Sequence, residues 1–321
     1  MANLSKRAGT GVHAAFLSPG TKEQIDVKTI AVIANNKKTL GGGLEELRQM
    51  LFERGYPDPM WLETSKGREV GKLARDAVAR GATLLFIWGG DGTVQRCVNA
   101  VVDRDVELAI LPAGTANLLA LNLDIPFDLA GALEIGLAGT SRRLDVGVMN
   151  GKCFAVMAGI GFDAITMQQA DGDLKERFGR LAYLWTGFKA LRVNARHTKI
   201  RVDGKTWFKG NATCVLFGQM KSVAKGIAIF PESQPDDGVL EVGVVTAESA
   251  RQWLRVIAQM AIGNAKHSPF TKMTQGRHVE VHLDRASRFE LDGGAKASRR
   301  THQVSVKPGA ITLRVPSESS S

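Results

Sequence analysis

The glycine-rich segment at residues 89–93, Gly-Gly-Asp-Gly-Thr, constrains the fold of this 321-residue chain more than any other feature. The apolar run from Thr83 to Trp88 predicts a buried strand before it, and the spaced apolar residues from Val94 onward predict a helix after it. Glycines at such a turn let backbone N–H groups converge on a phosphate, and the helix dipole adds positive charge. A carboxylate inside the turn favours a phosphate accompanied by a cation such as Mg²⁺. We therefore expect Asp91 to lie in a magnesium–nucleotide site.

Predicted strands and helices alternate from Val27 to about Leu144. Continuous apolar runs such as residues 29–34 are typical of parallel strands buried on both faces. This alternation predicts a doubly wound parallel sheet, whose ligands bind beyond the carboxyl ends of the strands. Turns follow four such ends, and they contain Asn35, Thr64, residues 89–93 and residues 114–117. Four turns at one edge predict a nucleotide site more strongly than any one of them alone.

The pattern changes after Arg143, where short segments of alternating apolar and polar residues predict antiparallel strands. Residues 154–158, 278–283 and 288–291 are examples. Two helices, at residues 174–192 and 250–263, interrupt this second, mostly β domain. We expect a flexible extension over residues 1–27, the nucleotide domain over 28–143, the β-rich domain over 144–315 and a disordered tail over 316–321.

Composition narrows the classes of partner. The formal net charge of +10 favours polyanions, namely nucleic acid, a nucleotide or an anionic membrane. Aromatic residues make up only 6%, and the sequence contains no recognised nucleic-acid-binding module, so we do not expect nucleic acid. Three separated cysteines in apolar segments (Cys97, Cys153 and Cys214) favour buried thiols in a cytoplasmic protein.

Further motifs follow the glycine-rich turn in a specific order. They are Leu-Pro-Ala-Gly-Thr-Ala-Asn at 111–117, Leu-Asp-Val-Gly at 144–147, Gly-Ile-Gly-Phe-Asp-Ala at 159–164, Asp-Asp-Gly-Val-Leu-Glu-Val at 236–242 and Leu-Asp-Gly at 291–293. In this order and spacing, the series resembles the diacylglycerol kinase catalytic-domain family, which includes bacterial soluble lipid kinases and the sphingosine and ceramide kinases. The resemblance extends over nearly the whole chain, from about Val27 to Val315.

The resemblance implies a nucleotide domain and a β-sandwich-like domain with the active site in the cleft between them. It implies an ATP-dependent lipid kinase, with diacylglycerol as the leading acceptor and phosphatidic acid as the product. It also implies that Asp91 and Asp292 are catalytic, that Asp292 is the base, and that Mg²⁺ accompanies ATP. The nucleotide-site residues would be Asn35, Thr64, Gly89, Gly90, Asp91, Gly92, Thr93, Gly114, Thr115 and Asn117.

A second Mg²⁺ site, of structural type, is implied at Asp237, with the backbone carbonyls of Gln234 and Val239 as further ligands. The residues alone give an alternative, because an Asp-Gly pair is also a common turn. For the whole protein we expect a cytoplasmic enzyme in transient contact with an anionic membrane surface. The sequence leaves open whether it forms a homodimer.

One departure from the family pattern affects the function. The family commonly has Asp-Gly-Glu where this chain has Asp292-Gly293-Gly294, so only Asp292 is left as a base. From the residues alone, a hairpin-turn role for Asp292 is about as strong an interpretation as a catalytic one. Two alternative functions therefore stand beside the lipid kinase: a soluble-metabolite kinase of NAD kinase type, and a catalytically weak protein that binds nucleotide and lipid.

Overall fold

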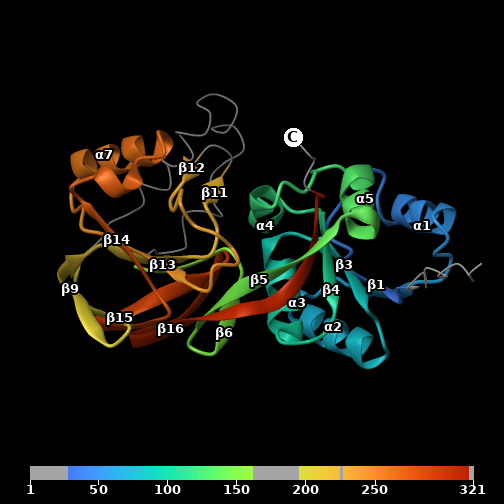
Figure 1. The fold of residues 1–321 in the computed structure, drawn as a ribbon, viewed down its shortest axis with the longest axis horizontal. Helices are drawn as coiled ribbons and strands as arrows, with labels where there is room; N and C mark the ends of the chain where they lie inside the picture. Colours follow the sequence, from blue (N-terminus) through green and yellow to red (C-terminus); the bar gives the residue numbers. More distant parts are fainter. Residues whose placement is uncertain (1–27, 162–194, 225–226, 318–321) are drawn as a thin grey trace, which may run out of the picture.

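Two lobes joined by long strands make up the computed structural model, which describes residues 28–161, 195–224 and 227–317 (Figure 1). The predicted fold class is confirmed: the N-terminal lobe is a parallel α/β sheet and the C-terminal lobe is mostly antiparallel β. The predicted N-terminal extension, helix 174–192 and most of the predicted tail lie outside the described residues.

The N-terminal sheet has the strand order β2-β1-β3-β4, with every neighbouring pair parallel. Its strands are β1 (Ile30–Asn35), β2 (Met60–Thr64), β3 (Leu84–Gly89) and β4 (Glu107–Pro112). Its helices are α1 (Leu44–Glu53), the short 3₁₀ helix η1 (Gly67–Glu69), α2 (Val70–Ala79), α3 (Asp91–Val101), α4 (Leu118–Asn122) and α5 (Leu129–Ala138).

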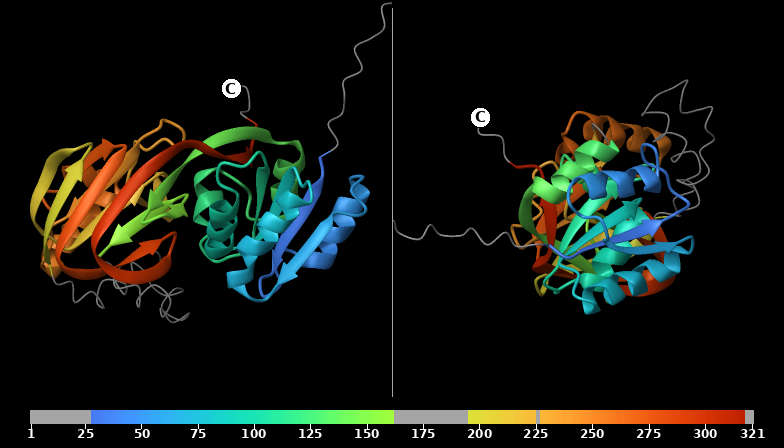
Figure 2. Two further views of the ribbon diagram at one scale, coloured as in Figure 1. Left: turned by 90° about the horizontal axis from the view of Figure 1, so that it is seen from below. Right: turned by 90° about the vertical axis from the view of Figure 1, so that its right-hand side faces the viewer.

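Helices cover both faces of this sheet, with α1 and α5 on one side and α2 and α3 on the other (Figures 1 and 2). All six residues of β3 are buried, as the continuous apolar run predicts. Because the strands are parallel, the turns that follow β1, β2, β3 and β4 all lie at one edge of the sheet. The candidate site forms at this edge.

The C-terminal lobe contains antiparallel strands and one described α-helix. The strands are β6 (Lys152–Phe154), β7 (Met157–Ile160), β8 (Arg196–Val202), β9 (Lys205–Ala212), β10 (Cys214–Gly218), β11 (Ser222–Ala224), β12 (Ile227–Ala228), β13 (Leu240–Val245), β14 (Thr271–Gly276) and β15 (His278–Leu291). Helix α7 (Ala250–Ala261) begins with a capping box between Ser249 and Gln252 and is followed by η3 (Ala265–His267).

Two long strands, β5 (Thr140–Met149) and β16 (Gly294–Val315), connect the lobes (Figure 2). They pair with each other along both lobes, and β16 then joins the N-terminal sheet by pairing in parallel with β4. Both strands therefore extend over the two lobes, and β5 contains the expected domain boundary near Arg143. That boundary stays a prediction from the sequence pattern. The continuous pairing fixes how the two lobes face each other.

No helix within the described ranges is both long and apolar enough to cross a membrane.

Candidate active site

Two loops from neighbouring strands meet backbone to backbone at the edge of the N-terminal sheet. A methyl group placed on Gly114 would lie 2.4 Å from the Cα of Gly90, and one placed on Gly90 would lie 2.9 Å from the Cα of Gly114. These distances are too short for any side chain, so both positions require glycine. The turn after β3 and the turn after β4 therefore form one continuous surface.

Asn117 closes the second of these loops. Its side-chain oxygen accepts a hydrogen bond from the N–H of Gly114 (2.9 Å), and its amide group donates to the carbonyls of Pro112 and Gly114. The residue is buried and has a positive φ of 48°, a conformation that asparagine tolerates better than most residues. Thr115, at the tip of the same loop, is exposed and free to meet a ligand.

Asp91 joins the two loops by its carboxylate. One oxygen accepts a hydrogen bond from the N–H of Asn117 (3.0 Å), and the other accepts one from the N–H of Leu118. Burial raises the pKa of this carboxyl, and the two backbone bonds oppose that rise. Each carboxylate oxygen has a second lone pair, so the same group can also accept a cation.

We expect Gly114→Ala to weaken nucleotide binding by roughly 10- to 100-fold, because the new methyl group forces the two loops apart at a cost of about 1–3 kcal/mol. Isothermal titration with ADP measures this effect. Gly71→Ala in α2 is the matched control, since its methyl group would meet its nearest neighbour at an ordinary 3.4 Å. Equal ADP affinity in both variants would show that the loop contact does not shape the site.

The turns after β1 and β2 lie at the same edge of the sheet and contact each other. The N–H of Asn36 donates to the carbonyl of Thr64 (3.2 Å), and the side-chain oxygen of Asn35 accepts from the N–H of Lys37. The hydroxyl of buried Thr64 donates to Glu69 (2.8 Å) and accepts from the N–H of Lys66. Asn35 and Thr64 thus shape their own turns in the described structure.

Asp292 comes from the other lobe, in the two-residue turn between β15 and β16. Its φ is +45° and its side chain is buried against the segment that links β6 to β7. The carboxylate accepts three backbone hydrogen bonds of 2.9–3.0 Å, from the N–H groups of Ala155, Val156 and Met157. The hairpin interpretation describes the backbone at Asp292, and the catalytic role of its buried carboxylate stays a prediction.

Burial raises the pKa of Asp292 to about 6, against the effect of the three N–H groups. The negative charge of Asp91 contributes to the rise, which places the two carboxylates within electrostatic reach of each other. They belong to different lobes, so the charges of the two lobes interact here. Sequence motifs about 200 residues apart are brought together here.

Helix α3 fixes this meeting of the lobes. The side-chain amide of Gln95 donates to the carbonyl of Cys153 (2.8 Å), and the side-chain oxygen of Asn99 accepts from the N–H of the same residue (3.0 Å). Asp91 begins this helix, and Cys153 lies just before the segment that binds Asp292. Sequence reasoning missed Gln95 and Asn99; their spacing of one helical turn was the available signal.

The predicted metal residues lie in a separate loop before β13. Asp237 is exposed, and one of its oxygens accepts a hydrogen bond from the N–H of Val239 (3.1 Å). Buried Asp145 holds this loop, because its two oxygens accept from the N–H groups of Gly238 and Gly309. Gln234 is exposed in the same loop. In the described part of the chain, no three His, Cys, Asp or Glu side chains gather as a metal cluster.

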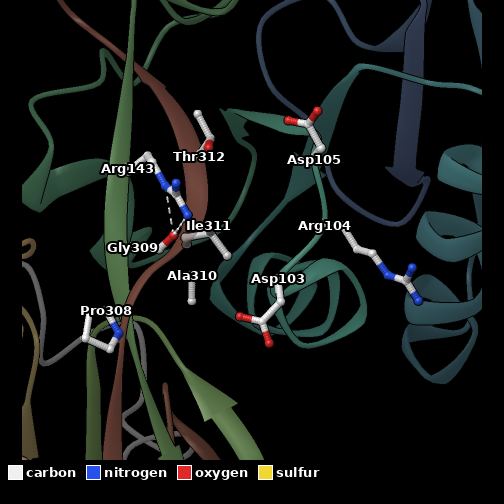
Figure 3. A pocket seen from close by; sticks show the side chains of 9 residues that line it. All are labelled: Asp103, Arg104, Asp105, Arg143, Pro308, Gly309, Ala310, Ile311 and Thr312. Carbon is white, nitrogen blue, oxygen red and sulfur yellow. Dashed lines mark hydrogen bonds between the residues drawn. The ribbon is translucent and has the colours of Figure 1, made fainter.

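A cavity of about 400 Å³ lies elsewhere, beside the junction of β16 with β5 and the loop after α3 (Figure 3). Arg143 points into this region and donates to the carbonyl of Gly309. The remaining lining residues are Asp103, Arg104, Asp105, Pro308, Ala310, Ile311 and Thr312. None of the residues predicted for the nucleotide or acceptor site lines this cavity.

Family models and named relatives match this chain over most of its length. The family model of the diacylglycerol kinase catalytic domain matches residues 29–149, and that of the YegS C-terminal NAD kinase beta sandwich-like domain matches residues 156–315. A Pseudomonas aeruginosa (strain UCBPP-PA14) protein named "Probable lipid kinase YegS-like" is 31% identical over 252 residues, which are 77% of this chain and 82% of that protein. The chain belongs to the diacylglycerol kinase family. It is thus an enzyme of lipid-kinase type, a phosphotransferase, as the sequence motifs predict.

Other proteins are similar to this chain in sequence or in fold. A Bacillus subtilis (strain 168) protein named "Diacylglycerol kinase" is 28% identical over 254 residues, 78% of this chain and 83% of that protein. A diacylglycerol kinase structure from Bacillus anthracis str. Sterne has a TM-score of 0.70 at 20% identity, with 90% of this chain and 97% of that chain covered. An NAD kinase from Archaeoglobus fulgidus has a TM-score of 0.51 at 10% identity, with 89% and 92% covered, which is a likeness of fold alone.

Proposed function

We propose that this protein phosphorylates the hydroxyl group of a lipid with ATP, and that diacylglycerol is the acceptor and phosphatidic acid the product. The observation that supports this best is the pair of carboxylates, Asp91 and Asp292, which come from the two lobes and whose charges interact. Asp91 begins a helix whose preceding turn is suited to phosphates, and Asp292 of the other lobe is within its electrostatic reach. A phosphoryl donor and a hydroxyl acceptor need such an arrangement.

In the proposed reaction, the acceptor hydroxyl oxygen attacks the γ-phosphorus of ATP. The new P–O bond forms as the bond from the γ-phosphorus to the β,γ-bridging oxygen breaks, and its electron pair stays on ADP. The hydroxyl proton passes to the carboxylate of Asp292. Three backbone N–H groups hold that carboxylate and leave about one of its four lone-pair positions for the proton.

The residues of the N-terminal lobe position the donor in this proposal. Backbone N–H groups of the two glycine loops bind the phosphates, and Thr93 and Asn117 keep the loops in shape from buried positions. The donor set at Asp91 fits Mg²⁺, because a half-buried carboxylate with unused lone pairs is a ligand of the kind this ion prefers. When bound, Mg²⁺ supplies positive charge beside the phosphate oxygens.

We propose a second, structural Mg²⁺ site at Asp237, with the carbonyls of Gln234 and Val239. The charge distribution supports it: burial raises the pKa of nearby Glu241, and the negative charges of Asp237 and Glu232 add to the rise. A cation bound at Asp237 would offset part of this negative charge. A site with one carboxylate suits Mg²⁺, which usually keeps several of its water ligands.

Mg²⁺ without nucleotide is expected to raise the melting temperature of the wild-type protein by a few degrees, because binding to the folded state alone stabilises it. Asp237→Asn should cancel this rise, as measured by differential scanning fluorimetry. Asp236→Asn is the matched control: it removes a surface ion pair with Arg142 but keeps the proposed ligand. A Mg²⁺ response that survives in Asp237→Asn places the cation elsewhere.

We propose that the enzyme takes its lipid from an anionic membrane surface by transient contact. Exposed basic residues of the β15–β16 region support this, at roughly 1 kcal/mol for each residue near the surface. They include Arg285, Arg288, Arg299 and Arg300.

The function is tested with radiolabelled ATP and vesicles that contain diacylglycerol, ceramide or a long-chain base, with NAD as a water-soluble acceptor. Label in phosphatidic acid supports the proposal, and label in NAD or in no acceptor overturns it.

A further inference from the structure

Lys296 occupies the space beside the position where the family pattern has an acidic residue. A methyl group placed on Gly294 would lie 3.4 Å from the Nζ atom of Lys296. The two residues are two positions apart on β16, so their side chains leave the same face of the strand. Lys296 therefore bends back toward the Asp292 turn. The departure at Gly294 removes a negative charge and leaves a positive one next to the same space.

Two further cations, Arg96 and Lys152, act on Lys296 through their charges. Burial lowers the pKa of Lys296, the charges of Lys152 and Arg96 lower it further, and Asp292 acts in the opposite direction. Within the described residues, none of the three cations has a carboxylate within 4.0 Å. A half-buried ammonium without a counterion is costly, and an anion bound there would remove that cost.

Arg96 connects this cationic cluster to the phosphate loop. Its guanidinium donates to the carbonyl of Gly92, and a methyl group on Gly92 would lie 3.0 Å from its Nη1 atom. Arg96 thus lies on the side of the phosphate loop and Lys296 on the side of Asp292. In the proposed reaction, the transferring phosphoryl group lies between these two sides.

We propose that Lys296 binds the γ-phosphoryl group of ATP during its transfer, and that Arg96 and Lys152 strengthen the positive field around it. This inference rests on the proposed function. The ammonium binds the non-bridging oxygens of the γ-phosphoryl group and leaves the proton transfer to Asp292. Charge on these oxygens is what a phosphoryl-transfer enzyme has to stabilise. Arg96 and Lys152 act at longer range, from exposed positions.

The test compares two nucleotides that differ by the γ-phosphoryl group, ADP and the β,γ-imido analogue of ATP, by isothermal titration in the presence of Mg²⁺. Lys296→Met should weaken binding of the analogue by about tenfold or more and change ADP binding by no more than about twofold, since a charge-assisted contact is lost for one nucleotide only. Lys296→Arg should restore most of the difference. Lys307→Met, which removes a β16 lysine that pairs with Asp103, is the control.

A second variant tests the same inference by the opposite route. Gly294→Glu places a carboxylate against Lys296 and should also weaken binding of the analogue relative to ADP, because the ammonium gains a partner. Equal effects of Lys296→Met on both nucleotides, or no effect on either, overturn the role of Lys296 alone. Wild-type protein that binds neither nucleotide overturns the proposed function together with it.

Discussion

Asp292→Asn is expected to lower the rate of lipid phosphorylation by roughly 10²- to 10⁴-fold, the range typical of a lost general base. Asparagine keeps the shape of the side chain but cannot take a proton from the acceptor hydroxyl. The change also turns an N–H donor of the new amide toward backbone donors, since the carboxylate accepts from Ala155, Val156 and Met157. We therefore expect a loss of about 1–3 kcal/mol in the free energy of unfolding as well.

The chain offers a matched control for that structural effect. Asp203 occupies the equivalent position in the β8–β9 hairpin, with a φ of +47°, a following glycine and bonds from the N–H groups of Arg277 and His278. Asp203→Asn should lose stability for the same reason, but less of it because Asp203 is exposed, while phosphorylation, assayed well below both melting temperatures, stays near wild type. Comparable activity in the two variants would remove Asp292 from the mechanism.

The pH profile gives a second readout of Asp292. Its pKa is raised to about 6, mainly by burial, so kcat/KM should fall as the pH drops through about 6 and the carboxyl becomes protonated. The same group changes the free energy of unfolding with pH in the opposite direction. A folded-state pKa above the ordinary 3.8 means that the contribution of this group is greatest below pH 3.8 and is lost as the pH rises through about 6. Activity and stability should therefore change in opposite directions across this range.

Local sequence signals predicted the N-terminal half well because its elements depend on local patterns. The buried run of β3, the glycine turn and the helix that follows are neighbours in sequence, and so each supports the others. The close approach of Gly90 to Gly114 follows from the parallel pairing of β3 with β4. A doubly wound sheet leaves little freedom at this edge.

The C-terminal half was harder to predict because distant segments decide its details. The sequence pattern predicts one strand over residues 154–158, but the structure divides them between β6 and β7. The N–H groups freed at this break, at Ala155 and Val156, are bound by Asp292 from more than 130 residues away. Segments 278–283 and 288–291 read as two strands, but they form one strand, β15, with register shifts between them.

The position of Lys296 shows a different limit of sequence reasoning. The sequence places it among several basic residues whose simplest role is solubility, and its distance from Gly294 depends on a side-chain direction in one strand. The missing acid at Gly294 was visible in the motif. The position of Lys296 beside Gly294 was not visible in the sequence. No pattern of spacing distinguishes a lysine that bends toward a turn from one that points to water.

Asp91→Asn is expected to reduce kcat/KM for ATP by on the order of 10²-fold or more, since a carboxylate that helps to hold Mg²⁺ beside the phosphates contributes several kcal/mol. The variant should also require more Mg²⁺ for half-maximal rate. One of the two backbone bonds from Asn117 and Leu118 is weakened in the same step, so the glycine loops lose part of their connection.

Asp128→Asn separates these two effects. Asp128 caps α5 by accepting from the N–H of Gly131, and it lies outside the glycine loops. Both variants weaken a bond between an aspartate and a helix N-terminus, at a cost of about 1 kcal/mol. Only Asp91→Asn should change the Mg²⁺ dependence of the rate. Since Asp91 also raises the pKa of Asp292, the same variant should move the acid limb of the pH profile to lower pH, a charge effect between the lobes that Asp128→Asn should not produce.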